Sequence, residues 1–218
     1  MELAGKKINF LGDSITQGVG SSAPEHIYLN VLKRNAHLAE ARNYGVSGTR
    51  IARQSTFRSD DPSQNVPFDR DFILRMDEMD RDADIVVVFG GTNDYGHGDA
   101  PIGTFSDRTP NTFYGACHVL MRGLIERFPD ATIVFMTPMH RREEVRSDAP
   151  DGSLENYVRI LQEVASYYAL PVLDLFRTVG IQPAVPILQE KFLPDGLHPN
   201  DAGNAKIAAR LQAFLESL

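Results

Sequence analysis

Short runs of apolar, mostly β-branched residues recur along the chain, and longer segments with helical periodicity separate them. The runs cover residues 8–11, 42–46, 85–89, 132–136 and 171–175. Runs that are apolar throughout suit a parallel sheet covered on both faces, because a half-exposed strand would alternate apolar and polar positions. The run at 42–46 is the weakest, and its position between a helical segment and the turn Ser47-Gly48-Thr49 is the main reason to assign it to the sheet.

Between these runs, apolar residues recur at steps of three and four, which is typical of helices with one buried face. Two shorter helices are expected at 28–39 and 72–79. Alternating strands and helices predict a single three-layer α/β domain over residues 1–218. The three longest stripes are Phe113, Cys117, Leu120, Leu124 and Phe128; Leu154, Tyr157, Val158, Leu161, Val164, Ala165 and Tyr168; and Ile207, Leu211, Phe214 and Leu218.

Composition narrows the classes of partner. The 218 residues are 42% hydrophobic, enough for one sizeable core, and the net charge of −7 argues against a nucleic-acid partner. No apolar run approaches the roughly 20 residues that span a bilayer, so no membrane partner is expected. A single cysteine, Cys117, and an N-terminus that leads directly into the first strand predict a cytoplasmic protein. The oligomeric state is not predicted.

A serine follows the first apolar run directly, in the stretch Gly12-Asp13-Ser14-Ile15. The carboxyl ends of parallel strands are where open α/β sheets bind their ligands, so Ser14 is a candidate nucleophile. The adjacent Asp13 is expected to accept backbone N–H groups and fix the turn, without a catalytic role.

Near the other end of the chain, Asp195 and His198 are separated by three positions, with Gly196 between them to allow a tight turn. At this spacing the carboxylate can reach one imidazole nitrogen and leave the other free, which is what a general base requires. The alternative is that both residues only cap the helix that begins near Pro199.

Two further elements follow predicted strands. Asn93, in Gly90-Gly91-Thr92-Asn93-Asp94, can donate amide N–H groups to an oxyanion or can simply form a turn. Gly48 can present its backbone N–H to the same oxyanion or merely permit a left-handed turn.

Taken together, these elements supply a nucleophile (Ser14), a base (His198) with its orienting acid (Asp195), and three oxyanion donors, namely the Ser14 and Gly48 N–H groups and the Asn93 amide. The doubly wound topology would gather them at one edge of the sheet. Tyr95 and His140 are candidate substrate contacts. His97 is a loop residue of the same kind as His140, and His118 is expected to be a structural residue on a helix.

These motifs resemble the four conserved blocks of the SGNH hydrolases, also called the GDSL esterase/lipase family, and they occur in the family's order over nearly the whole chain. The first block has Ile15 where the family name has Leu, a conservative change. The resemblance implies a flavodoxin-like parallel sheet of order 2-1-3-4-5. It also implies a triad of Ser14, His198 and Asp195, an oxyanion hole from Ser14, Gly48 and Asn93, and no metal or cofactor.

Two other classes of protein share parts of this pattern. A metal-dependent phosphoesterase would need an early Asp-x-His and a His after the Asn, and neither is present. A nucleotide- or flavin-binding module on a flavodoxin-like fold would be non-catalytic. The segment 12–18 lacks the Gly-Lys-Ser/Thr ending of a phosphate-binding loop, and 18–22 lacks the third glycine of a dinucleotide fingerprint.

The expected substrate is a small-molecule ester with a short acyl group, such as acetate, on a polar or carbohydrate alcohol. A long acyl channel would need apolar loops, whereas the two long loops, 50–69 and 95–111, carry many charged and polar residues. A long-chain lysophospholipase or thioesterase of the same family is the alternative. The charged and polar residues of the two loops are Arg50, Arg53, Gln54, Arg58, Asp60, Asp61, Asp107 and Arg108.

Overall fold

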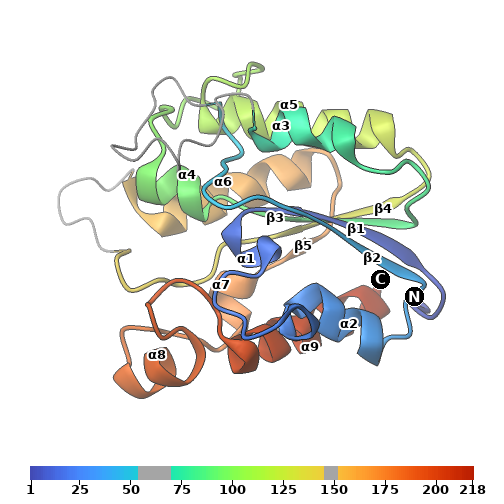
Figure 1. Ribbon diagram of the computed structural model, residues 1–218. Helices are drawn as coiled ribbons and strands as arrows, with labels where there is room; N and C mark the ends of the chain where they lie inside the picture. The colour runs from blue at the N-terminus through green and yellow to red at the C-terminus, as the bar shows by residue number, and fades with distance from the viewer. Residues whose placement is uncertain (54–69, 145–151) are drawn as a thin grey trace.

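The computed structural model describes residues 1–53, 70–144 and 152–218, and within them the chain forms a five-stranded, all-parallel sheet of order β2-β1-β3-β4-β5. The predicted strand order is confirmed. Figure 1 shows helices on both faces of this sheet. The strands are β1 (Lys7–Gly12), β2 (Glu40–Gly45), β3 (Ile85–Phe89), β4 (Thr132–Met136) and β5 (Val172–Leu173).

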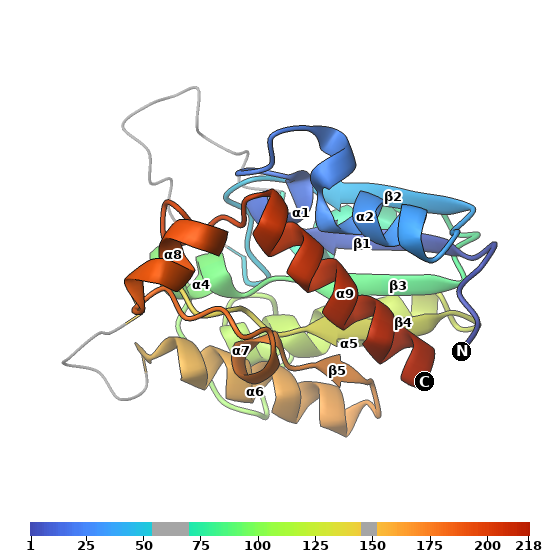
Figure 2. The ribbon, with the colours of Figure 1, turned by 90° about the horizontal axis from the view of Figure 1, so that it is seen from below.

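The helices belong to two layers. Seen from below in Figure 2, α2 and α9 cross one face of the sheet, and α3, α5 and α6 pack on the opposite face. The helices are α1 (Ser14–Gln17), α2 (Tyr28–Asn35), α3 (Phe72–Arg75), α4 (Thr92–His97), α5 (Phe113–Arg127), α6 (Leu154–Tyr167), α7 (Leu175–Thr178), α8 (Pro186–Phe192) and α9 (Asp201–Ser217), with 3-10 turns η1 (Pro24–His26) and η3 (Met76–Glu78).

The central strand β3 explains why the sheet needs cover on both sides. All five of its residues are buried. Val87 and Phe89 join the core beneath α2 and α9, while Val86 and Val88 join the core beneath α3, α5 and α6. Because successive side chains of a strand point to opposite faces, one apolar run contributes to two cores.

The edge strand β2 differs from its prediction. It begins two residues earlier than expected, at Glu40, and ends at Gly45, one residue before the expected end. None of its residues is fully buried, because β2 has a neighbour on one side only. Its apolar content is therefore low, and the hydrophobic pattern locates it poorly.

Several helix boundaries also differ from expectation. The helix expected at 28–39 ends at Asn35, because His37 adopts a left-handed φ of 54° that stops the helix. The segment 72–79 divides into α3 and η3. The loop expected at 95–111 begins inside α4, which continues to His97. At the end of α9 the buried residue is Leu215, whereas the predicted Leu218 is 48% exposed. Residues 54–69 of the other long loop lie outside the described residues.

Strand register brings the candidate residues to one edge. Gly12, the last residue of β1, pairs with Gly45 of β2 and with Phe89 of β3. The three strands therefore end level with one another. The segments that carry Ser14, Gly48 and Asn93 all leave the sheet at that point.

Candidate active site

Ser14 is the first residue of α1, and the turn that presents it is held by its neighbour. The Asp13 carboxylate caps the helix by accepting the backbone N–H of Ile15 at 3.0 Å. Gly12 permits the tight turn, because a Cβ at this position would lie 2.0 Å from Thr16 Oγ1. The side chain of Asp13 therefore fixes the turn that carries Ser14, in the way its sequence position predicts.

His198 joins the two ends of the chain at this site. Its Nε2 lies 2.9 Å from Ser14 Oγ, and its Nδ1 lies 2.7 Å from Asp195 Oδ2. The imidazole is therefore held between hydroxyl and carboxylate in the order Ser14, His198, Asp195. The His198 side chain is 19% exposed and that of Asp195 is 54% exposed.

The Asp195 carboxylate is held in its charged form by donors on its own turn. Partial burial alone would raise its pKa. The N–H of His198 at 2.7 Å, the His198 ring and the N–H of Leu197 at 2.8 Å outweigh that effect and lower the pKa below its ordinary value. An ionised carboxylate at this position can orient an imidazole and stabilise its cation.

An asparagine in α9 fastens the His198 turn to the segment after Ser14. Asn204 is fully buried; its amide donates to Pro199 O at 2.9 Å and to Ser21 Oγ at 3.1 Å, and its carbonyl accepts the N–H of Tyr28 at 2.9 Å. Asn204 was not among the residues predicted from the sequence. The available signal was an amide at a position where α9 turns toward the core.

The two other candidate oxyanion donors lie on neighbouring segments. Gly48 has a φ of +74°, which a residue with a side chain rarely adopts. Asn93 is the second residue of α4, and one N–H of its amide donates to Thr49 O at 3.0 Å. This hydrogen bond joins the Gly48 turn to α4, so the structure brings both predicted residues together.

Asp94 anchors the chain after Gly48. Its two carboxylate oxygens accept the N–H groups of Ile51 at 3.0 Å and Ala52 at 2.8 Å. Burial raises the pKa of Asp94 to about 6 despite these hydrogen bonds. Burial likewise raises the pKa of Asp13 to about 7, and the nearby Asp94 adds to this effect. Two carboxyl groups beside Ser14 are thus held at unusually high pKa values.

The two candidate substrate contacts both bind residues of the segment that follows β4. Tyr95 is buried in α4 and its hydroxyl donates to Glu143 O at 3.1 Å. His140 Nδ1 lies 2.7 Å from Glu144 Oε1, and its ring packs on Phe176 with centroids 3.8 Å apart. These contacts show structural roles, and contact of either residue with substrate stays a prediction.

His97 and His118, the other two histidines considered in the sequence, take no part in the Ser14–His198–Asp195 hydrogen bonds. His97 ends α4, and its carbonyl accepts from Arg50 at 2.8 Å. His118 is buried in α5, as expected of a structural residue, and its Nδ1 lies 3.2 Å from the hydroxyl of Tyr168.

The segment after β4 also connects α4 with the His198 turn. Arg141 donates to Thr92 O at 3.1 Å, and the N–H of Arg142 donates to Gly196 O at 2.8 Å. A hollow of about 200 Å³ beside Asp195 is lined by Arg141, Arg142, Glu143, Asp195, Gly196 and Leu197. Residues 145–151, which follow this segment, lie outside the described residues.

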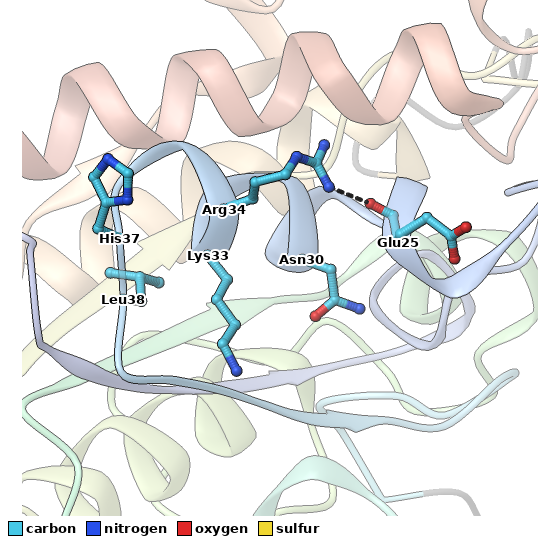
Figure 3. Close-up of a pocket in the computed structure, with 6 residues that line it drawn as sticks. All are labelled: Glu25, Asn30, Lys33, Arg34, His37 and Leu38. Atoms are coloured by element: carbon cyan, nitrogen blue, oxygen red, sulfur yellow. Dashed lines mark hydrogen bonds between the residues drawn. The ribbon is translucent and has the colours of Figure 1, made fainter.

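No cluster in the described segments brings together three His, Cys, Asp or Glu side chains in a way that could hold a metal ion. None of the helices there is both long and apolar enough to cross a bilayer. A separate pocket of about 670 Å³, shown in Figure 3, lies against α2 and contains none of the candidate site residues. It is lined by Glu25, Asn30, Lys33, Arg34, His37 and Leu38.

A Ser, His and Asp hydrogen-bonded in this order is an arrangement that hydrolases on several folds use for acyl transfer. The model of the GDSL-like lipase/acylhydrolase family matches residues 10–206. The chain belongs to this family and is a carboxylic ester hydrolase. The family resemblance seen in the motifs is thereby confirmed.

Solved structures give the same result for the fold. A protein from Lactobacillus plantarum is 32% identical, with 98% of each chain covered and a TM-score of 0.82. An acetyl xylan esterase is 21% identical, covering 95% of this chain and 98% of its own, with a TM-score of 0.65. A two-domain esterase active on acetylated mannans is 22% identical over 97% of this chain and 49% of its own, with a TM-score of 0.63. Among curated proteins, none matches.

Proposed function

We propose that the chain hydrolyses short-acyl esters, chiefly acetyl esters of a polar or carbohydrate alcohol, through an acyl-enzyme formed on Ser14. The observation that carries this proposal is the pair of hydrogen bonds from His198, 2.9 Å to Ser14 Oγ and 2.7 Å to Asp195 Oδ2. A serine hydroxyl is a weak nucleophile until an adjacent base removes its proton.

In the first half of the reaction, His198 Nε2 takes the proton of Ser14 as Oγ attacks the ester carbonyl. The carbonyl oxygen becomes an oxyanion that accepts the N–H groups of Ser14 and Gly48 and the second N–H of the Asn93 amide. Asp195 stabilises the imidazolium that forms. Collapse of the tetrahedral intermediate breaks the bond to the alcohol oxygen, which receives the proton from His198.

In the second half, the same imidazole removes a proton from a water molecule that attacks the acyl-enzyme. The same three donors hold the second oxyanion. The acid then leaves, and Ser14 regains its proton from His198. Each proton removed by His198 is returned, so the cycle needs no metal or cofactor.

The preference for a short acyl group and a polar alcohol has support of two kinds. The loops at the active edge are polar in sequence, and two esterases that share this fold act on acetylated xylan and mannan. Several of the loop charges are, however, bound to other parts of the protein or within their own loop. Arg50 donates to His97 O, Arg53 pairs with Asp71 at 3.2 Å, and Asp107 accepts from Thr104. Gln54, Arg58, Asp60 and Asp61 lie outside the described residues.

The test combines substrates and a variant. With p-nitrophenyl esters from acetate to palmitate, we expect the highest kcat/KM at acetate, and acetylated xylo- and manno-oligosaccharides should release acetate. Ser14→Ala should fold normally and lose roughly 10⁴-fold or more of the activity. An organophosphate should label Ser14 and no other residue.

The outcomes separate the two parts of the proposal. An optimum at long acyl chains would contradict the substrate assignment and favour a lysophospholipase or thioesterase. Activity that survives in Ser14→Ala would contradict the nucleophile. Failure of wild-type protein to hydrolyse any ester would point to a non-catalytic binding module.

A further inference from the structure

A buried arginine lies behind the proposed oxyanion donors. Arg75 is the last residue of α3, its side chain is almost fully buried, and its guanidinium lies over the Phe72 ring at 5.0 Å. Nε donates to Arg70 O at 3.0 Å and Nη1 donates to Tyr44 O. Nη2 donates to Gly12 O at 3.0 Å and to Thr49 Oγ1 at 2.8 Å. One side chain thus connects several segments that are separate in sequence.

Three of these acceptors, Gly12 O, Tyr44 O and Thr49 Oγ1, lie on the segments next to the oxyanion donors. Gly12 closes β1 two residues before Ser14. Thr49 directly follows Gly48, and the carbonyl of Thr49 accepts the Asn93 amide at 3.0 Å. Gly12 O also accepts the N–H of Val46 at 3.1 Å, which ties the start of the Gly48 turn to the end of β1. The guanidinium therefore fixes the relative positions of all three donor segments.

The charge of Arg75 calls for a functional explanation. Burial lowers its pKa to about 10, so it remains a cation at neutral pH. In the described part of the chain its hydrogen-bond acceptors are three carbonyls and one hydroxyl, all neutral. Among the described residues no carboxylate lies within ion-pair distance of Arg75, although Glu78, Asp13 and Asp71 favour its charge from farther away. A buried charge without a direct ion pair is a poor way to stabilise a fold, because an apolar side chain of the same size avoids the desolvation cost. The planar fork of a guanidinium is, however, well suited to holding several acceptors in fixed directions.

We infer that Arg75 is a positioning residue for ester hydrolysis, which holds the ends of β1 and β2 and the Thr49 hydroxyl so that the N–H groups of Ser14 and Gly48 and the Asn93 amide converge on one point. The inference rests on the proposed function. A displacement of about 1 Å in such donors is enough to cost roughly 10²-fold in rate, since oxyanion stabilisation depends on donor geometry.

Arg127 provides a matched control. It lies at the end of α5, its side chain is 12% exposed, and its Nη2 donates to two backbone carbonyls, Asp77 O and Met79 O, each at 2.7 Å. Arg75→Met and Arg127→Met thus both remove a largely buried guanidinium that binds backbone carbonyls. Arg127 also pairs with the exposed Asp77 at 3.4 Å. Only Arg75 reaches the donor segments.

The measurement is kcat and KM for p-nitrophenyl acetate, taken below the melting temperature of every variant. For Arg75→Met we expect kcat to fall about 10²-fold with KM within about threefold of wild type. Arg75→Lys should lose about tenfold, because an ammonium keeps the charge but not the fork. Arg127→Met should keep wild-type kcat. A kcat in Arg75→Met equal to that of Arg127→Met would overturn the inference.

Thr49 tests the same network if Arg75→Met does not fold. Thr49→Val removes the hydroxyl that Arg75 binds and should lower kcat about tenfold, whereas Thr49→Ser keeps the hydroxyl and should retain kcat. Equal kcat values in these two variants would also overturn the inference. Ser14→Ala, assayed alongside, separates the two claims. Activity in that variant contradicts the proposed function, and its loss combined with an unaffected Arg75→Met contradicts only the role of Arg75.

Discussion

The two edges of the sheet carry the same types of charged residue in opposite environments. At the amino edge, Asp82 accepts from Lys7 Nζ at 2.7 Å and from Arg42 Nη1 at 2.6 Å, and the Asp82 side chain is 57% exposed. At the carboxyl edge, Asp13 and Asp94 are buried and accept mainly backbone N–H groups. One edge is an exposed ion-pair network, and the other is a buried network of polar and charged groups.

The pKa values move in opposite directions at the two edges. The hydrogen bonds from Arg42 and Lys7 hold the pKa of Asp82 below its usual range. In turn, the hydrogen bonds to the Asp82 and Glu40 carboxylates raise the pKa of Arg42. Burial raises the pKa of Asp13 to about 7 and lowers that of Arg75 to about 10. The amino edge therefore favours charge, whereas burial at the carboxyl edge opposes the charges of Asp13, Asp94 and Arg75. Groups held against their solvation preference are frequent at functional sites, and here they surround Ser14.

The largest expected effect compares two buried asparagines. Asn93 donates to Thr49 O at the carboxyl edge, and Asn9 donates to Asp80 O at 2.8 Å at the amino edge. Asn93→Ala should lower kcat by about 10²–10³-fold, because an oxyanion donor is lost. Asn9→Ala should lower the free energy of unfolding by about 1–3 kcal/mol, because a buried partner is lost, with kcat unchanged. Steady-state kinetics and urea denaturation of both variants provide the measurement. Equal losses of kcat would show that the two edges do not differ in function.

A smaller effect is expected in the pH dependence of stability. Because the folded pKa of Asp13, about 7, exceeds its ordinary value of 3.8, the folded state binds more protons between these pH values, and stability falls as pH rises through that window. Asp13→Asn keeps a helix cap and cannot ionise, so its unfolding free energy should fall less steeply from pH 4 to 7.

Asp84 is the matched control for this titration. Its oxygens accept from Lys7 N–H at 2.8 Å and from Lys6 Nζ at 3.3 Å, and the first of these bonds chiefly lowers its pKa below 3.8. Its contribution is present above that pH and lost as pH falls through the folded pKa. Asp84→Asn and wild type should therefore diverge in how stability depends on pH only below about pH 4. If the pH dependence of stability of Asp13→Asn also departed from that of the wild type only below about pH 4, the buried carboxylate would titrate as the exposed one does.

The smallest expected effect is at the exposed ion pairs. Asp82→Asn should produce a small decrease in melting temperature that disappears at high salt, because exposed pairs are weak and screened. Its kcat should equal that of the wild type. A large, salt-insensitive decrease would mean that the amino edge is as tightly coupled to the fold as the carboxyl edge.

The parts of this molecule that could be predicted are those that local runs of apolar residues and short motifs indicate. The limits of β3 and β4 match the apolar runs, because both strands are covered on two faces. Ser14, Asp195 and His198 were predicted from motifs of a few residues, and the structure brings their side chains within hydrogen-bonding distance. The parallel topology then explains why segments so far apart in sequence meet.

What could not be predicted depends on distant contacts. From the sequence, Arg75 would be placed as a solvent-facing charge on a short helix. In the structure its hydrogen-bond partners Tyr44 and Gly12 lie 31 and 63 positions away. Asn204 lies 176 positions from Tyr28, whose N–H it accepts. Nothing in the sequence around Arg75 indicates burial, and the position of Asn204 on the core-facing side of α9 does not identify its hydrogen-bond partners. The bounds of β2 differ from the prediction for a related reason. An edge strand does not need the apolar content by which a central strand is recognised in the sequence.

The hydrogen bond between Ser14 and His198 also has a consequence for folding kinetics. It joins residues 184 positions apart, so it closes a loop of most of the chain and cannot form until α9 has docked on the sheet. An intermediate with a formed sheet and an undocked α9 has a hydroxyl without its base. During refolding we therefore expect recovery of esterase activity to lag behind the helical signal of α5 and α6, which rest on more local contacts.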